Sequence, residues 1–213
     1  MAEILKVDPV APEPEGIVRA ATVVRQGDVI AFPTDTLYGL AADAFNQAAV
    51  ERVFAIKERP PESPLLLLVD SVEMAKRCAE RLPPLFPRLA ARFWPGPLTL
   101  VVDASARIPA LVTANTRRVG LRLPAAAIAL ALVRAVGGPV TATSANRSGM
   151  PACRSAADVQ AALGDRLPLI LDGGPSPRAQ PSTVVGITDS SWEMIREGAI
   201  PAAELASFLK SQN

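Results

Sequence analysis

Apolar residues in this chain occur in short runs, and this constrains the fold more than any other feature of the sequence. No run approaches the ~20 consecutive apolar residues that a membrane-spanning helix needs. Short apolar runs that end at Gly, Pro or polar residues favour buried strands of a sheet. We predict strands over residues 29–32, 65–69, 98–102, 119–123, 140–143, 169–172, 183–187 and 192–195.

Between these runs, apolar positions repeat with the period of a helix. Within residues 15–26, Ile17, Ala20, Ala21 and Val24 fall at i, i+3, i+4 and i+7. Similar patterns predict helices over 71–81, 84–93, 125–136, 155–163 and 202–210, and a helical stripe through 50–54. The alternation predicts one α/β domain, residues 1–213, with three layers: a mixed, twisted β-sheet flanked by helices and a ligand cleft at the strand ends.

The chain contains no histidine, which excludes Ser-His-Asp and Cys-His catalysis, HExxH zinc sites and imidazole as a general base. Its two cysteines, Cys78 and Cys153, are far apart and imply no disulfide framework. The net charge of +1 gives no general attraction to nucleic acid or membranes. Because the N-terminus is acidic and proline-rich, unlike a signal peptide, we expect a soluble cytoplasmic protein with no membrane contact.

Polar and basic residues gather directly after the predicted strands, where open α/β sheets bind their ligands. Thr34, Asp35 and Tyr38 follow strand 29–32. A plain turn would account for Asp35. It accounts less well for Thr34, which is the first hydroxyl after the strand. This turn is therefore the first candidate part of a binding site.

Lys57 and Arg59 form a second candidate group. Lys57 stands where the helical stripe calls for an apolar residue, and Arg59 precedes two prolines that stop the helix and restrict the chain. Two ordinary explanations remain open. Lys57 could bury its stem and keep its amine in water, and Arg59 could interact with the helix dipole.

Further cations and hydroxyls belong to later strands. Arg118 and Arg122 are four residues apart in a predicted strand and therefore project from one face, which is either a binding face or a solvated one. Two adjacent guanidiniums repel each other unless an anion lies between them. Ser144 opens a tight turn whose backbone amides could bind an anion, although such turns are common. Ser182 and Arg196 add one more hydroxyl and one more cation.

These candidates are cations and small hydroxyls, with few groups suited to acid or base catalysis. Phosphate-binding signatures of the GxxxxGK[ST] and GxGxxG types are absent. The set favours a reaction in which the substrates supply the nucleophile and the leaving group. The protein then supplies positioning and charge neutralisation, as in phosphoryl or nucleotidyl transfer.

The motifs, in order, are FPTDTLYGLAADA, IKERP with PLLLLV, FWPGPLTLVV, RRVGLRLP, TSANRSG, PSTVVGI and IREGAI. Together they resemble the YrdC-type family of threonylcarbamoyl-AMP synthases over residues 29–200. The resemblance implies a YrdC-like fold and a nucleotidyltransferase that makes threonylcarbamoyl-AMP and pyrophosphate from L-threonine, bicarbonate and ATP, with Mg²⁺. Downstream enzymes would use this product to make threonylcarbamoyladenosine in tRNA.

The resemblance also implies roles for individual residues. L-Threonine would contact Thr34, Arg122, the backbone at Ala142, and Ser182. ATP would contact Arg59, Ser63, Arg118, Ser144, the backbone at Ala152, and Arg196. Lys57 and Arg59 would be catalytic, with Lys57 facing the phosphates, and no protein residue would bind a metal. Some relatives have histidine where this chain has Leu68, so that threonine contact is missing or replaced here.

Two other functions stay open from the sequence. The chain could be an RNA-binding module for tRNA or rRNA that does not turn over ATP, or a carbamoyl-adenylating domain like that of hydrogenase-maturation carbamoyltransferases. Weak tRNA binding is compatible with a local basic patch. The proline-held loop 173–181 is predicted to act as a lid that keeps water from labile intermediates.

Overall fold

The computed structural model describes residues 1–177 and 180–210, which form 11 strands and seven helices. The strands are β1 (Glu3–Lys6), β2 (Ile30–Phe32), β3 (Gly39–Ala41), β4 (Leu66–Leu68), β5 (Leu98–Asp103), β6 (Arg118–Arg122), β7 (Val140–Thr141), β8 (Thr143–Ser144), β9 (Leu169–Asp172), β10 (Thr183–Ile187) and β11 (Trp192–Arg196). The helices are α1 (Pro14–Arg25), α2 (Gln47–Lys57), α3 (Val72–Cys78), α4 (Leu85–Phe93), α5 (Ala127–Val136), α6 (Ala156–Leu163) and α7 (Ala202–Lys210).

The strands form two mixed sheets flanked by helices. One sheet has the order β1-β9-β2-β3-β8, and the other has the order β11-β10-β5-β6-β4-β7. Each contains parallel and antiparallel pairs, such as β2 with β9 and β2 with β3 in the first sheet. The predicted α/β class with mixed, helix-flanked strands is confirmed. The strands divide between two sheets instead of joining one.

The chain changes sheets at Ala142, and this divides the strand predicted over 140–143. β7 pairs with β4 in the six-stranded sheet, whereas β8 pairs with β3 in the five-stranded sheet. The amide of Ala142, between them, donates to the carbonyl of Leu66. Two further strands, β1 and β3, were not predicted, because β1 has charged ends and β3 is only three residues long and begins with glycine.

Helix positions agree closely with the apolar periodicity. The predicted stripe of α1, made of Ile17, Ala20, Ala21 and Val24, is buried. Ser155 caps α6 in a reciprocal capping box, as its spacing predicts. These contacts orient the helices against the sheets.

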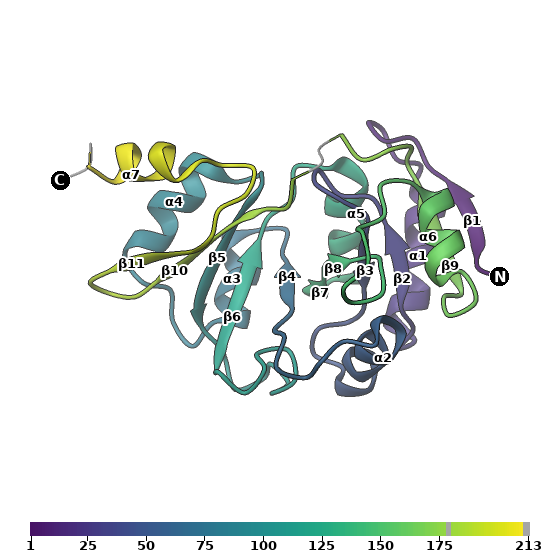
Figure 1. Cartoon of the computed structure of the whole chain (residues 1–213), viewed down its shortest axis with the longest axis horizontal. Coiled ribbons are helices and arrows are strands. Elements are labelled where there is room, and N and C mark those ends of the chain that lie inside the picture. The colour runs from purple at the N-terminus through teal and green to yellow at the C-terminus, as the bar shows by residue number, and fades with distance from the viewer. Residues whose placement is uncertain (178–179, 211–213) are drawn as a thin grey trace.

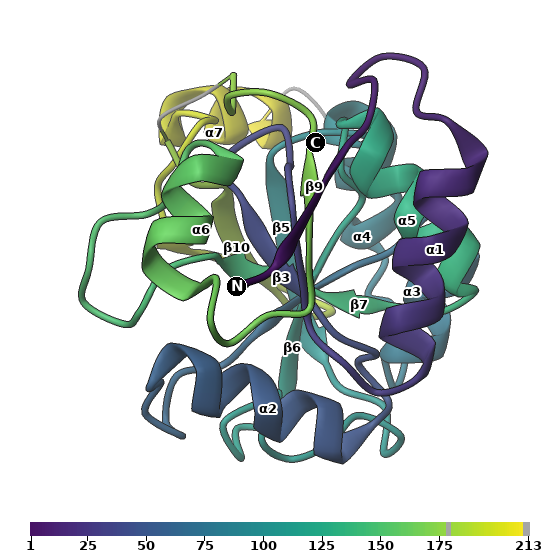
Figure 2. The ribbon, with the colours of Figure 1, turned by 90° about the vertical axis from the view of Figure 1, so that its right-hand side faces the viewer.

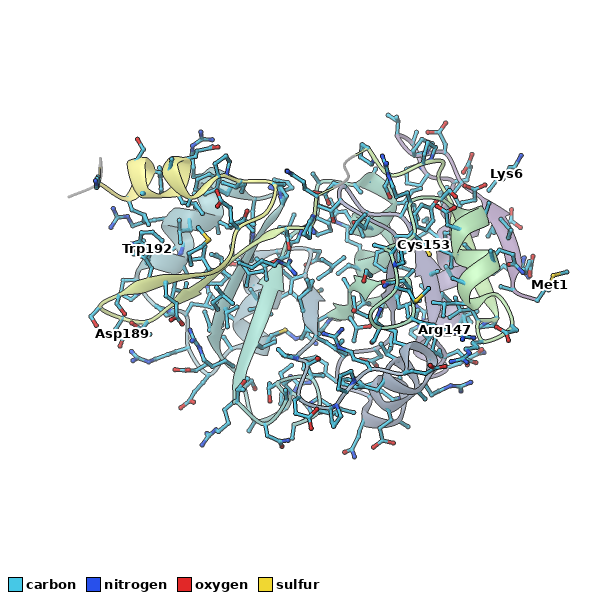
Figure 3. All side chains as sticks on the ribbon, in the orientation of Figure 1. Met1, Lys6, Arg147, Cys153, Asp189 and Trp192 are labelled. Atoms are coloured by element: carbon cyan, nitrogen blue, oxygen red, sulfur yellow. The ribbon has the colours of Figure 1, made fainter. Side chains whose placement is uncertain are left out.

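The two sheets share one cluster of buried apolar side chains. The five-stranded sheet and the N-terminus lie at one end of the long axis, and β10, β11 and α7 lie at the other (Figure 1). α1 and α5 pack together on one side of the five-stranded sheet, and α6 lies on the opposite side (Figure 2). Lys6 and Trp192 mark the two ends (Figure 3). Within the described ranges, no helix has both the length and the apolar character needed to cross a membrane.

Candidate active site

A cavity of about 770 Å³ lies where the two sheets meet. Its wall comes from β4, β5, β6, β10 and β11 of the six-stranded sheet, and from β8 and the turn after β2 of the other sheet. Nine of the predicted site residues line it: Thr34, Arg59, Ser63, Arg118, Arg122, Ala142, Ser144, Ser182 and Arg196. Segments far apart in the sequence therefore converge on one site.

Arg122 is the most completely held cation of this wall. Its Nε donates to the carbonyl of Gly96 at 3.0 Å, and its Nη1 donates to Oγ1 of Thr36 at 3.1 Å. Its Nη2 lies 2.6 Å from Oδ2 of Asp35, and the Arg122 side chain is only 4% exposed. The guanidinium is thus fixed in orientation, and a fully solvated strand face does not describe this position.

Arg118 lies on the same face of β6, as the spacing predicts, but nearer to solvent. Its Nη1 lies 2.9 Å from Oε1 of Glu193, in a pair whose side chains are 30% and 63% exposed. Gly120, between the two arginines, also lines the cavity, and a Cβ there would lie 3.0 Å from Cγ2 of Thr99. The glycine keeps the floor between the arginines open.

Arg59 reaches the cavity from the end of α2. The helix ends at Lys57, and Glu58 takes a left-handed conformation with φ of 53°, which turns the chain before the prolines. The Arg59 guanidinium donates to the carbonyls of Ser63 at 3.1 Å and Pro64 at 2.8 Å. Burial lowers the pKa of Arg59 from its usual value.

Arg196 and Ser182 form a further part of the wall. Nη2 of Arg196 donates to the Ser182 carbonyl at 2.8 Å, and the Ser182 hydroxyl lies 2.9 Å from Oγ1 of Thr99. Burial, and then the charge of nearby Arg122, lowers the pKa of Arg196. The cations are therefore close enough to repel each other, and an anionic ligand would relieve this repulsion.

Lys57 lies outside the described wall of the cavity. It is only 1% exposed and is not among the lining residues in the described part of the chain. Its ammonium donates to the backbone carbonyls of Ser144 and Asn146, the latter at 2.6 Å, so it supports the loop after β8 from behind. The amine of Lys57 is engaged with backbone oxygens and does not face the described cavity, so its contact with the phosphates stays a prediction. The alternative with the amine in water is wrong.

Burial, reinforced by the charge of Arg59, lowers the pKa of Lys57 to about 8, from 10.5. Above pH 8 the folded protein therefore releases a proton that the unfolded chain retains, so stability rises with pH. Between pH 8 and 9, the free energy of unfolding should rise by about 1 kcal/mol relative to that of Lys57→Met. Urea denaturation of both proteins measures this difference, and parallel pH profiles would contradict it.

The turn after β2 contributes hydroxyls. Oγ1 of Thr34 accepts from the amides of Thr36 and Leu37 at 3.1 and 3.2 Å, which fixes the turn. The Tyr38 hydroxyl donates to the carbonyl of Gly174 at 2.7 Å. Burial and nearby Asp172 raise the pKa of Tyr38, so it remains a neutral phenol.

Some residues of the site escaped sequence prediction. Thr36 and Thr99 both line the cavity, and the only signal for Thr99 was a hydroxyl inside an apolar strand pattern. Conversely, Ala152, predicted to offer its backbone to ATP, is not a lining residue among those described. Leu68, at the position of the relatives' histidine, is fully buried in β4 beside Arg122 of β6. The predicted lid includes residues 178 and 179, which lie outside the described residues.

The resulting wall is strongly cationic. Among the described residues that line it, four are arginines and one, Glu62, is acidic. The described residues contain no cluster of three or more Cys, Asp or Glu that could hold a metal ion. Guanidiniums and hydroxyls without an acid–base pair suit a polyanionic ligand and a carboxylate.

The family model for Sua5, YciO and YrdC proteins, described as "Telomere recombination", matches residues 22–198. The chain belongs to the Sua5/YciO/YrdC family. It is 39% identical over 190 residues to threonylcarbamoyl-AMP synthase of Pyrococcus abyssi, covering 89% of this chain and 56% of that protein. It is 36% identical over 183 residues to threonylcarbamoyl-AMP synthase of Vibrio vulnificus, covering 82% of this chain and 94% of that protein.

Solved structures of the Sua5/YciO/YrdC family share the fold. The crystal structure of P. abyssi Sua5 complexed with L-threonine matches with a TM-score of 0.94 at 37% identity, over 98% of this chain and 61% of that one. The chain spans slightly more than half the length of the P. abyssi relative. The match to P. abyssi Sua5 covers 98% of this chain, and the cavity described above lies within this chain.

Proposed function

We propose that this protein makes threonylcarbamoyl-AMP and pyrophosphate from L-threonine, bicarbonate and ATP. The observation that carries the proposal is the cavity between the sheets, where four arginines from three segments converge with hydroxyls, with no acid–base pair among the described lining residues. The names of the relatives and the threonine complex of P. abyssi Sua5 support it. Residues 1–213 would work as one domain, supported by the core that both sheets share.

Two halves of the cavity would bind the two larger substrates. The threonine half would use Thr34, Arg122, the backbone at Ala142, and Ser182, and the ATP half would use Arg59, Ser63, Arg118, Ser144, the backbone at Ala152, and Arg196. Buried Arg122 is suited to a single carboxylate, because its planar guanidinium is fixed by three groups. More exposed Arg118 and Arg59 suit a flexible polyphosphate.

The substrates can supply the nucleophile themselves. The threonine amine and bicarbonate combine to a carbamate with loss of water, and a carbamate oxygen attacks the α-phosphorus of ATP. The bond between that phosphorus and the bridging oxygen breaks, and pyrophosphate leaves with the electron pair. The arginines stabilise the charge on the phosphoryl oxygens, so the chemistry needs no histidine.

Mg²⁺ would enter with ATP and not as a resident ion. Magnesium is commonly held by one or two carboxylates together with substrate phosphates. In the described part of the wall Glu62 is the acidic residue, which fits a metal bound mainly by the triphosphate. The ion would neutralise phosphate charge, and the arginines would orient the chain of phosphates.

Lys57 would act through the loop that it holds. Its ammonium fixes the carbonyls of Ser144 and Asn146, and Ser144 lines the cavity. Lys57 would therefore be a positioning residue, and Arg59 would be the member of the pair that touches the phosphates. This division modifies the prediction that both are catalytic.

Arg122→Lys should weaken threonine binding by ~1.5 to 3 kcal/mol, because lysine makes a point contact where arginine makes two parallel hydrogen bonds. ATP affinity should remain nearly unchanged. Calorimetric titration with each ligand measures both effects, and Arg118→Lys on the same face serves as control. An equal loss of ATP affinity in Arg122→Lys would place Arg122 on the phosphate side.

The product itself tests the proposal against its alternatives. The protein is incubated with ATP, Mg²⁺, L-threonine and ¹⁴C-bicarbonate, and AMP-linked products are separated and weighed by mass spectrometry. One labelled product containing threonine and AMP supports the proposal. A labelled AMP product formed equally well with ammonium in place of threonine would indicate carbamoyl adenylation, because ammonia and bicarbonate combine to carbamate with loss of water, and no nucleotide product would favour the RNA-binding module.

The cellular setting remains part of the proposal. Downstream enzymes would transfer the threonylcarbamoyl group to tRNA, and we place the reaction in the cytoplasm. Direct tRNA binding would be weak, since the net charge is +1.

A further inference from the structure

Each arginine of β6 that lines the cavity pairs with a carboxylate from another segment. At the rim, Arg118 pairs with Glu193, whose side chain is 63% exposed. In the interior, Arg122 pairs with Asp35, whose side chain is 12% exposed. Asp35 is not among the described lining residues, so it contacts Arg122 without forming part of the described cavity wall.

Fold stability alone does not account for the interior pair. Removing two charges from water is costly unless hydrogen bonds satisfy both of them. Among the described residues, no group donates a well-formed hydrogen bond to either oxygen of Asp35, so its favourable contact is the ion pair 2.6 Å long. The pair as a whole therefore adds little net stability, although loss of Asp35 alone would leave the buried charge of Arg122 without its partner.

Asp35 completes a frame around the guanidinium. The carbonyl of Gly96 and the hydroxyl of Thr36 hold Nε and Nη1, and Asp35 holds Nη2. Asp35 and Thr36 belong to the same turn, so one short segment determines the direction of the guanidinium plane. A bidentate contact with a carboxylate depends on that direction.

Asp35 also adjusts the charge of this half of the cavity. Arg196 is close enough to Arg122 for their charges to interact. The negative charge of Asp35, 2.6 Å from Nη2 of Arg122, offsets part of the repulsion between Arg122 and Arg196. Without Asp35, the repulsion between the two guanidiniums would be stronger, and Nη2 of Arg122 would lose its partner.

We propose that Asp35 is a positioning residue that fixes Arg122 for the α-carboxylate of the amino-acid substrate. The inference rests on the proposed function, because it assumes that Arg122 receives this carboxylate. It adds a residue outside the cavity wall to the threonine half. Asp35 itself would touch neither substrate.

The test measures binding of L-threonine and ATP by calorimetry to Asp35→Asn, which keeps the side-chain shape and removes the charge. Threonine affinity should fall about 10-fold or more, as for coupled neighbouring residues. ATP affinity should remain within about twofold of wild type. Glu193→Gln is the matched control, since it removes the carboxylate partner of the other β6 arginine, and its threonine affinity should not change.

A second background separates positioning from general damage. In Arg122→Gln, adding Asp35→Asn should cause no further loss of threonine affinity, because Asp35 acts through Arg122. An additional loss, or wild-type affinity in Asp35→Asn alone, would overturn the inference. If Asp35→Asn does not fold, Asp35→Ser replaces it, and failure of both to fold would assign Asp35 to stability instead. If wild-type protein binds no threonine, the proposed function fails before this inference is reached.

Discussion

Arg59→Ala should lower the rate of threonylcarbamoyl-AMP formation by at least ~100-fold, the scale of removing one group that stabilises transition-state charge. Its guanidinium lines the cavity and is held by the Ser63 and Pro64 carbonyls, so its charge is already in place when ATP binds. The free energy of unfolding should fall by only about 1 kcal/mol, because Arg59 is partly exposed and the freed carbonyls can be hydrated. Steady-state kinetics and urea denaturation measure the two effects.

Arg52→Ala is the matched control, because Arg52 lies on the same helix, α2, and its side chain is 59% exposed in an ion pair with Asp28. It should retain wild-type turnover. If Arg59→Ala instead loses stability and keeps its activity per folded molecule, the guanidinium serves the helix end and not the phosphates.

Lys57→Ala should damage both turnover and stability. Removal of the buried ammonium leaves the carbonyls of Ser144 and Asn146 without their donor and creates a cavity along the lost stem. These two losses together are expected to cost about 3–5 kcal/mol of unfolding free energy. Turnover should also fall ~100-fold, because Ser144 moves with the released loop.

The comparison with Arg59→Ala distinguishes the two roles of this pair. Lys57→Met fills the stem volume and should recover part of the stability, but not the turnover. If Lys57→Ala is as stable as wild type but has reduced turnover, Lys57 acts directly on the phosphates and does not support the loop. Exposed Lys76, whose side chain is 63% exposed on α3, provides the control substitution.

Local patterns predicted the elements of this fold better than their arrangement. The stripe of α1 and the cap of α6 depend on residues within one or two turns, so periodicity and spacing suffice. The division into two sheets depends on how the strands on either side of Ala142, β7 and β8, are paired. β7 pairs with β4 and β8 pairs with β3, and a local sequence pattern cannot predict pairing with strands so far away along the chain.

The site shows the same contrast. Arg118 and Arg122 were predicted to share a face because strand geometry alone requires it. Asp35 and Lys57 could not be placed from sequence, since their roles depend on partners 87 residues away along the chain, as for Lys57 with Ser144. A charged residue in an apolar stripe signalled that Lys57 was unusual, but only the fold shows that its ammonium holds a loop.

Pyrophosphate release from ATP, with L-threonine and bicarbonate omitted in turn, tests the central claim most directly. The claim is that the substrates supply the nucleophile and that the protein supplies position and positive charge. The account predicts release only when threonine, bicarbonate, ATP and Mg²⁺ are all present, and a large loss of it in Arg59→Ala. Release at an equal rate without threonine would contradict it.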